Sequence, residues 1–192
     1  MQYIDAIIRI GEADGGYVTS RGLKEKGVPT VYLTRMVNAG MLCKLAEGIY
    51  ILPKYMEDEI YTTALRYRRA IFSRHTALYL HGITNKQIEC IEANFPARYN
   101  TTKIQEIKCY RLSKDLYELG QITVVTAFRH IVNAYSIERC ICDLFYCDDF
   151  DIEEKGYAIR AIDKSKIDYD KLFAYAKRMK VLPQVKSVFE VL

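Results

Sequence analysis

GGYVTSRGLKEKGVPTVYLTRMVNAGMLCKLAEGIYILP, residues Gly15 to Pro53, is the stretch of sequence that decides the fold of the first quarter of this chain. Thr19 or Ser20 can cap the start of a short helix, and Gly27 supplies the permissive backbone that ends it. Pro29 suits the first turn of the next helix, because it lacks an N–H group and its φ is already near the helical value. The sequence therefore predicts two helices joined by a tight turn.

The second of these helices is expected over residues 30–39, where apolar residues recur at helical spacing. The residues expected to face the core are Leu33, Met36 and Val37. The residues expected to point largely outward are Tyr32, Thr34, Arg35 and Asn38. Gly40 then closes the helix as a C-terminal cap.

A hairpin is predicted next. Two short apolar runs, residues 41–45 and 49–52, are separated by Ala46-Glu47-Gly48, in which the glycine permits the positive φ of a hairpin bend. Helix, turn, helix and hairpin in this order are typical of a winged helix-turn-helix, a fold that commonly reads DNA. We therefore expect a winged helix-turn-helix over residues 1–54.

The outward side chains of the second helix are the candidates for reading bases. Arg35 can donate two hydrogen bonds to the O6 and N7 atoms of guanine, and Asn38 can pair with adenine. Thr30 or Thr34 can contact phosphate or a thymine methyl group, and Tyr32 lies among them. The lysines expected to bind phosphate are Lys24, Lys44 and Lys54. The same residues would also suit an ordinary solvated surface on a fold used for protein contacts.

The charge of this segment is modest for a DNA-binding surface. Residues 1–54 contain seven Lys and Arg residues against five Asp and Glu residues. A surface that follows phosphates usually carries a larger excess, so we expect a single copy to bind weakly and dimers or paired sites to be used.

The whole chain has 192 residues and a formal net charge of +4, which leaves room for two small domains. The N-terminus has the pattern of an amphipathic helix rather than of a signal peptide, and no apolar run approaches the length of a membrane span. We therefore expect a cytoplasmic protein without membrane contact, whose cysteines are reduced. The Cys-x-Cys spacing of Cys140 and Cys142 differs from that of zinc knuckles, so neither a metal nor a cofactor is expected. Cys147 lies in the same predicted helix, and Cys43, Cys90 and Cys109 are expected to pack as small apolar residues.

Residues 55–192 are expected to form a second domain of α+β class. A charged connector, residues 54–59, leads into a helix over residues 60–70, and Ser73 and Gly82 can cap and end the next helix. Segments rich in β-branched and aromatic residues predict strands over residues 87–95, 104–112 and 122–126. Further helices are predicted over residues 136–147, 151–160, 169–179 and 183–191.

Four blocks of this sequence resemble AbiEi-type antitoxins, which belong to bacterial type IV toxin-antitoxin and phage abortive-infection systems. The blocks, in chain order, are AGMLCKLAEGIYILP, which ends the winged module, then AIFSRHTALYLHGIT, ANFPARYN and VNAYSIERCICDLFY. The resemblance extends over nearly the full chain. The resemblance implies an N-terminal winged helix that represses its own operon by binding repeats upstream of it. It also implies a C-terminal domain that counters a toxin resembling a nucleotidyltransferase. In this family the antitoxin opposes the effect of the toxin and need not form a stable complex with it. The DNA-reading residues then fall on residues 30–38 and on the hairpin.

An antitoxin surface is harder to place from the sequence. Four arginines bracket the start of the second domain, and guanidinium groups can bind an acidic toxin surface or nucleic-acid phosphate: Arg66, Arg68, Arg69 and Arg74. The alternative is that the helix over residues 60–70 simply has a solvated basic face.

Two other classes of function stay open. The chain fits an ordinary winged-helix regulator whose second domain senses a ligand or dimerises. An enzyme with an appended DNA-binding module would need a catalytic centre around His75, His81 or an aspartate such as Asp143, yet no nucleophile motif or phosphate loop accompanies them. We therefore expect the protein not to be an enzyme.

Overall fold

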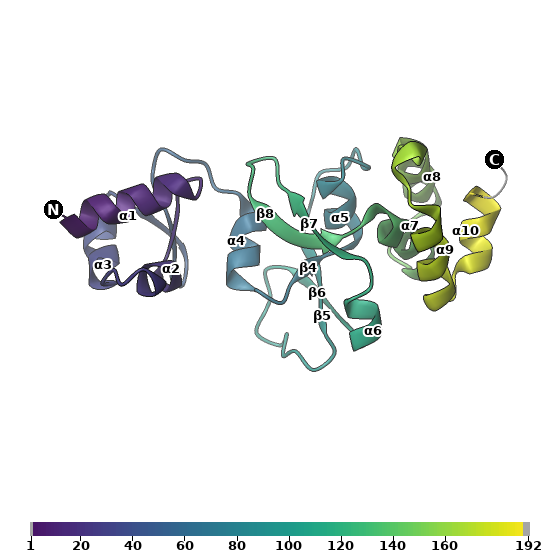
Figure 1. Cartoon of the computed structure of the whole chain (residues 1–192), viewed down its shortest axis with the longest axis horizontal. Coiled ribbons are helices and arrows are strands. Elements are labelled where there is room, and N and C mark those ends of the chain that lie inside the picture. Colours follow the sequence, from purple (N-terminus) through teal and green to yellow (C-terminus); the bar gives the residue numbers. More distant parts are fainter. Residues whose placement is uncertain (1, 190–192) are drawn as a thin grey trace. The chain divides into compact units, whose positions relative to one another are not determined.

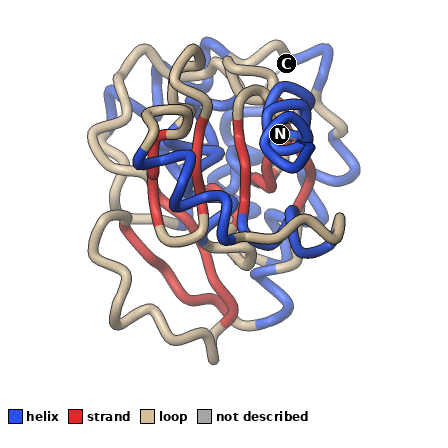
Figure 2. The backbone as a smooth tube through the Cα atoms, turned by 90° about the vertical axis from the view of Figure 1, so that its left-hand side faces the viewer, coloured by secondary structure: helices blue, strands red, loops and turns tan. Residues whose placement is uncertain are grey.

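The computed structural model describes residues 2–189, which fall into two compact units. The first unit takes the chain up to Arg68 together with Val125–Val132, and the second takes Arg69–Val124 and the chain from Asn133 onward. Helices and strands are interspersed along the chain, which is a mixed α+β fold as expected (Figures 1 and 2).

The first unit contains four helices and a three-stranded sheet among its described residues. In chain order these elements are α1 (Gln2–Ala13), β1 (Tyr17–Thr19), α2 (Ser20–Glu25), α3 (Val31–Asn38), β2 (Cys43–Ala46), β3 (Ile49–Ile51) and α4 (Glu59–Arg66). The sheet has the order β1-β3-β2, and both strand pairs are antiparallel. The apolar faces of α1, α2 and α3 meet in a core around Ile7, Leu23 and Leu33.

Local signals explain the start of this unit. The side chain of Thr19 accepts a hydrogen bond from the backbone N–H of Gly22 and so caps α2. Gly27 and Gly48 have φ values of +69° and +72°, which glycine adopts at little cost, at the end of α2 and at the tip of the β2–β3 hairpin. The predicted helices and hairpin of residues 19–52 are therefore confirmed as elements.

The compact unit continues past Lys54, where the sequence analysis ended the first domain. Leu65 and Tyr61 on α4 pack against Tyr17 and Ile49 of the small sheet. The Tyr17 hydroxyl also accepts a hydrogen bond from the backbone N–H of Asp58 at 2.8 Å. These contacts bury one face of α4 on the sheet, which is why the unit ends at Arg68. The helix itself stops at Arg66, short of the predicted residue 70, because Tyr67 leaves the helical region with φ −119° and ψ 77°.

The segment Val125–Val132 is attached to this unit through Asp58. The carboxylate of Asp58 accepts a hydrogen bond from the Thr126 hydroxyl at 2.6 Å, and its Oδ2 lies 2.8 Å from the His130 Nδ1 atom. The ring of His130 stacks on Tyr61 with the centroids 4.1 Å apart. Nothing local in the sequence around His130 indicates this partner, which is 72 residues away.

The second unit is built on a five-stranded sheet of order β6-β5-β4-β8-β7. The strands are β4 (Ile71–Phe72), β5 (Glu92–Pro96), β6 (Lys108–Leu112), β7 (Gln121–Val125) and β8 (Ile131–Tyr135). β4 pairs antiparallel with β5 and parallel with β8, and β5 pairs parallel with β6. The helices are α5 (Arg74–Leu80), α6 (Lys114–Tyr117), α7 (Ile137–Tyr146), α8 (Ile152–Ala161), η1 (Lys164–Lys166), α9 (Tyr169–Arg178) and α10 (Leu182–Phe189). The main core gathers α5 and the helices from α7 to α10, with Ile141, Leu144 and Leu172 fully buried.

Several expectations for this unit need correction. β4 and β8 were not predicted, because a strand of two residues and a strand directly before a helix cap carry little periodic signal. β5 and β6 are shorter than the predicted strands, since the residues before each of them form turns and loops. The helices over residues 136–147, 151–160 and 169–179 are confirmed, and Asp151 caps α8 in a reciprocal capping box with Glu154. The predicted helix 183–191 corresponds to α10, and residues 190 and 191 lie outside the described part of the chain.

The cysteines divide into two groups. Cys140, Cys142 and Cys147 are buried in and beside α7, as expected for apolar packing. Cys43 is exposed on β2, so the packing expected for it is wrong. Cys90 and Cys109 are half-buried, and Cys90 lies in the loop before β5 rather than in the predicted strand. No helix within residues 2–189 is long and apolar enough to span a membrane.

Candidate functional site

α3 presents one polar stripe to solvent. Thr34, Arg35 and Asn38 are exposed, whereas Leu33 and Met36 on the opposite side are buried. Val31 extends the stripe by one turn and is 55% exposed, although the sequence analysis did not single it out. Residues spaced three and four apart on a helix share a face, so these side chains lie on one exposed face of α3.

Tyr32 and Thr30 differ from the rest of the predicted set. The Tyr32 ring is half-buried and lies 5.3 Å from the ring of Tyr3 on α1, so it contributes to packing between helices. The Arg35 guanidinium lies over the Tyr32 ring at 5.5 Å, an arrangement that positions the arginine. Thr30 occupies the N-cap position of α3 without a capping side-chain hydrogen bond.

The β2–β3 hairpin carries the predicted phosphate-binding lysine. Lys44 Nζ lies 2.8 Å from a carboxylate oxygen of Glu47, and both side chains are exposed. This hydrogen bond raises the pKa of the Lys44 amine and lowers that of the Glu47 carboxyl. In the free protein the nearest charge to Lys44 is therefore opposite to its own. Lys24 is exposed on α2, and Lys54 pairs with Glu12 at 2.6 Å.

The four arginines proposed as one surface have different surroundings. Arg66 and Arg68 belong to the first unit and line a concavity there, together with Arg21 and Lys24. Arg69 belongs to the second unit and is exposed.

Arg74 is not the exposed cation that the sequence analysis expected. Its side chain is 14% exposed, forms an ion pair with Asp149, and lies 3.5 Å from the centroid of the Tyr110 ring. The backbone of Arg74 has a φ of +51°, which a residue with a side chain rarely adopts. These contacts make Arg74 part of the interior of the second unit.

A buried carboxylate next to Arg74 was missed by sequence reasoning. Glu92, the first residue of β5, accepts hydrogen bonds from the backbone N–H of His75 at 3.0 Å and from the Tyr110 hydroxyl at 3.1 Å. The His75 Nδ1 atom lies 2.8 Å from the same carboxylate, and Glu154 lies 3.5 Å from the other ring nitrogen. A glutamate within the predicted strand over residues 87–95 was the available signal.

The electrostatics of this pair are mutual. The hydrogen bond to Glu92 is the main cause that raises the pKa of His75. Burial alone would raise the pKa of Glu92, but the hydrogen bond and charge of His75 and the hydrogen bond from Tyr110 outweigh it and lower that pKa. Charged His75 and charged Glu92 therefore stabilise each other.

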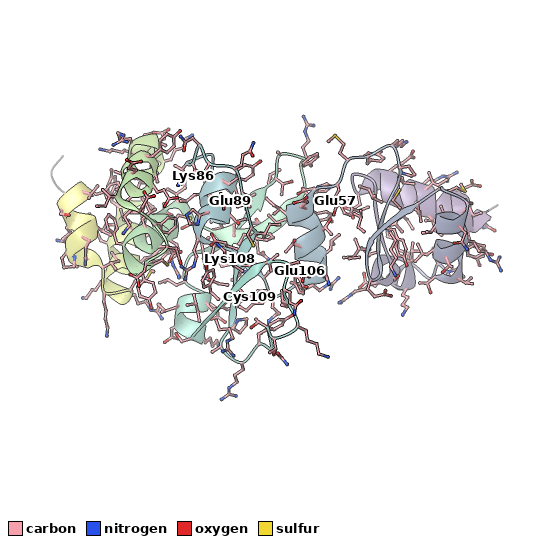
Figure 3. The ribbon with its side chains drawn as sticks, turned by 180° about the vertical axis from the view of Figure 1, so that it is seen from behind. Glu57, Lys86, Glu89, Glu106, Lys108 and Cys109 are labelled. Atoms are coloured by element: carbon pink, nitrogen blue, oxygen red, sulfur yellow. The ribbon has the colours of Figure 1, made fainter. Side chains whose placement is uncertain are left out.

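A cavity of about 670 Å³ opens beside this pair in the second unit. Its walls include His75, Glu92 and Glu154, with Lys86 and Lys108 at the sides. Figure 3 labels Lys86 and Lys108, which come from the segment after α5 and from the start of β6. The lining also includes Glu89 and Asp149, so carboxylates outnumber the two lysines around the cavity.

The residues considered for catalysis make separate contacts. The His81 Nε2 atom lies 2.7 Å from the carbonyl oxygen of Tyr135. Asp143 accepts a hydrogen bond from Arg139 at 3.0 Å inside α7. Neither contact involves His75, whose partners are Glu92 and Glu154. Within residues 2–189 no group of three or more metal-binding side chains is arranged to hold an ion.

Comparisons with known proteins support the fold class. No protein-family model matches this sequence, and no curated protein matches it. The chain is similar in structure to the RV2827C protein from Mycobacterium tuberculosis, known from a crystal structure, with a TM-score of 0.54 and 12% sequence identity. The match covers 99% of this chain and 81% of that protein. At this identity the likeness extends to the mixed α+β fold alone.

Proposed function

We propose that the first unit is a winged helix-turn-helix that binds specific DNA, and that the whole chain is an antitoxin and autorepressor of the AbiEi type. The observation that carries the DNA-binding part is the exposed stripe of Thr34, Arg35 and Asn38 on α3, which follows the capped helix α2 and precedes a hairpin. The element order and the antiparallel order β1-β3-β2 match the usual arrangement of winged helix-turn-helix domains.

In this proposal α3 enters the major groove and the β2–β3 hairpin is the wing. Arg35 donates to guanine, Asn38 pairs with adenine, and Lys44 contacts phosphate. The DNA target is operator DNA with repeats upstream of the protein's own operon, bound by a dimer or by paired copies. The partner of the second unit is a toxin resembling a nucleotidyltransferase, countered with or without a stable complex.

The antitoxin part of the proposal rests on the sequence resemblance. The four resembling blocks fall on the β2–β3 hairpin, on β4 and α5, on β5, and on β8 and α7. In the second unit they supply both His75 and the buried Arg139, so they include parts of its polar interior.

A second candidate function is an ordinary regulator whose second unit senses a ligand. The cavity of about 670 Å³ beside His75 and Glu92 favours this alternative, because it offers polar side chains of both charges to a small molecule.

The two candidates can be separated in cells with full-length protein. The gene next to this one would be expressed as the candidate toxin, with wild-type protein or Arg35→Ala supplied separately, and a reporter would follow the promoter upstream. We expect wild type to restore growth and repress the reporter, and Arg35→Ala to restore growth without repressing. A toxic neighbour that wild type fails to counter would overturn the antitoxin assignment and favour the regulator. Full repression by Arg35→Ala would overturn the role given to α3.

A further inference from the structure

A basic concavity of about 350 Å³ lies in the first unit beside the β2–β3 hairpin. Its walls come from the start of α2, from the tip of the hairpin and from the C-terminal end of α4. We call this hollow the basic concavity, because four cationic residues line it: Arg21, Lys24, Arg66 and Arg68. Glu47 also lines it, and its carboxylate is held by Lys44 at 2.8 Å.

The start of α2 and the tip of the hairpin are held together by the backbone. The N–H of Ser20 donates a hydrogen bond to the carbonyl oxygen of Gly48 at 2.8 Å. Thr19 on β1 is directly opposite Ile49 on β3. These bonds fix the position of Arg21 and Lys24 relative to the hairpin before any ligand arrives.

The end of α4 is held against the same strands by apolar packing. Leu65 packs in the cluster formed by Tyr17, Ile49 and Ile51. Arg66 follows it as the last residue of α4, and Arg68 comes directly after the C-cap residue Tyr67. The packing of Leu65 against these strands therefore brings two arginines beside the hairpin.

The charge of Arg68 reaches α2. The hydrogen bond from Arg21 is the main cause that lowers the pKa of the exposed Glu25 carboxyl, and the charge of Arg68 lowers it further. Arg21 and Glu25 form an ion pair at 2.8 Å in which both side chains are more than half exposed. Such an exposed pair contributes little to stability. A phosphate group can therefore replace the Glu25 carboxylate as the partner of Arg21 at little cost.

We propose that the basic concavity binds phosphate groups of the DNA backbone, so that the end of α4 forms part of the DNA-binding surface together with α3 and the hairpin. This inference rests on the proposed DNA-binding function of the first unit. Guanidinium groups bind phosphate through two parallel hydrogen bonds, and Arg66 and Arg68 supply two such groups from a fixed helix end. The concavity also supplies the cations that residues 1–54 lack, since both arginines lie beyond that segment.

The inference assigns Arg66 and Arg68 to DNA rather than to an acidic surface of a toxin. Their neighbours in the concavity are the tip of the hairpin, which is the wing in the proposed function, and the start of α2, which carries the predicted phosphate-binding residue Lys24. A phosphate contact has no base preference, so its loss weakens binding to every sequence and makes binding less dependent on salt.

The test compares two full-length double variants by fluorescence anisotropy. Arg66→Ala/Arg68→Ala removes two cations of the concavity, and Lys177→Ala/Arg178→Ala removes two exposed cations from α9 as a control of equal charge. Each protein is titrated into short duplexes that tile the DNA upstream of its gene and into a random duplex of the same length, at several KCl concentrations. Arg66→Gln/Arg68→Gln repeats the test if the alanine variant has an altered thermal unfolding curve.

We expect the loss of Arg66 and Arg68 to make the slope of log Kobs against log[salt] less steep by about 1.8, on both kinds of duplex. Affinity at low salt should fall by roughly tenfold or more, while the α9 control stays near wild type. A slope equal to that of the control would overturn the inference and leave the proposed function intact. A loss confined to one sequence would also overturn it, because it would indicate base reading. If wild type bound neither duplex, both the proposed function and the inference would fail.

Discussion

The ring of His75 and the carboxylate of Glu92 form a hydrogen-bonded pair at 2.8 Å, with the Glu92 side chain only 2% exposed. The pair connects the start of α5 to the start of β5, two elements that are adjacent in the second unit. It ties the stability of this unit to the protonation of one histidine.

The stability of the protein should therefore fall as pH rises through the pKa of His75. The folded protein raises this pKa above the ordinary value of 6.5, so the contribution of charged His75 is fully present below that value. It is lost progressively at higher pH, as the folded protein releases the proton. Urea unfolding of wild type and His75→Gln from about pH 6 to about pH 9 measures this difference. Parallel curves for the two proteins would contradict the expectation.

Arg35→Ala should weaken binding to a specific DNA site by about 1–3 kcal/mol and relax the preference at one base pair. The reason is that Arg35 is exposed on α3 and is proposed to donate to guanine, while it also rests over the Tyr32 ring. Anisotropy with the site and with single-base variants measures both effects. Arg9→Ala, which removes an exposed cation from α1, is the matched control. An equal loss on random DNA would count against a base contact.

Lys44→Ala should weaken binding to all DNA sequences alike and reduce the salt slope by about one. Glu47→Gln should do the opposite and strengthen binding, because it removes the carboxylate that holds Lys44 at 2.8 Å. Titrations at several salt concentrations with the same duplex measure both variants. A Glu47→Gln variant that binds more weakly than wild type would argue that the pair itself positions the hairpin.

Asp143→Ala should destabilise the protein by about 3–5 kcal/mol, because it leaves the buried guanidinium of Arg139 without its counter-charge. The Arg139 side chain is 1% exposed and donates also to the carbonyl oxygens of Leu116 and Leu119. Replacing both members, as in Arg139→Met/Asp143→Leu, should restore much of the loss, since no charge is then buried. Urea unfolding of the three proteins gives the free energies. A double variant less stable than Asp143→Ala would show that the bonds to the two carbonyls outweigh the cost of burying the charge.

The sequence by itself determined the local elements of the first unit. Leu33 and Met36 have helical spacing, Thr19 is a capping residue, and Gly48 permits a hairpin bend, and each of these signals acts over a few residues. The α+β class and the helices after residue 136 were predictable for the same reason. The exposed face of α3 with Arg35 also followed from periodicity, although the burial of Tyr32 did not.

Only the tertiary structure decided which distant side chains meet. β4 is a strand because it pairs with β5 and β8, although its two residues are too few to indicate a strand by themselves. β8 is a strand because it pairs with β4, although it directly precedes a helix cap. Asp58 is hydrogen-bonded to His130, and Glu92 is hydrogen-bonded to His75. Leu65 on α4 packs against Ile49, and this packing extends the first unit to Arg68. Such pairs depend on how the chain packs, and a buried charge is stable only where packing supplies its partner. The sequence therefore marks the candidate DNA-reading helix, whereas packing decides the surroundings of the four arginines.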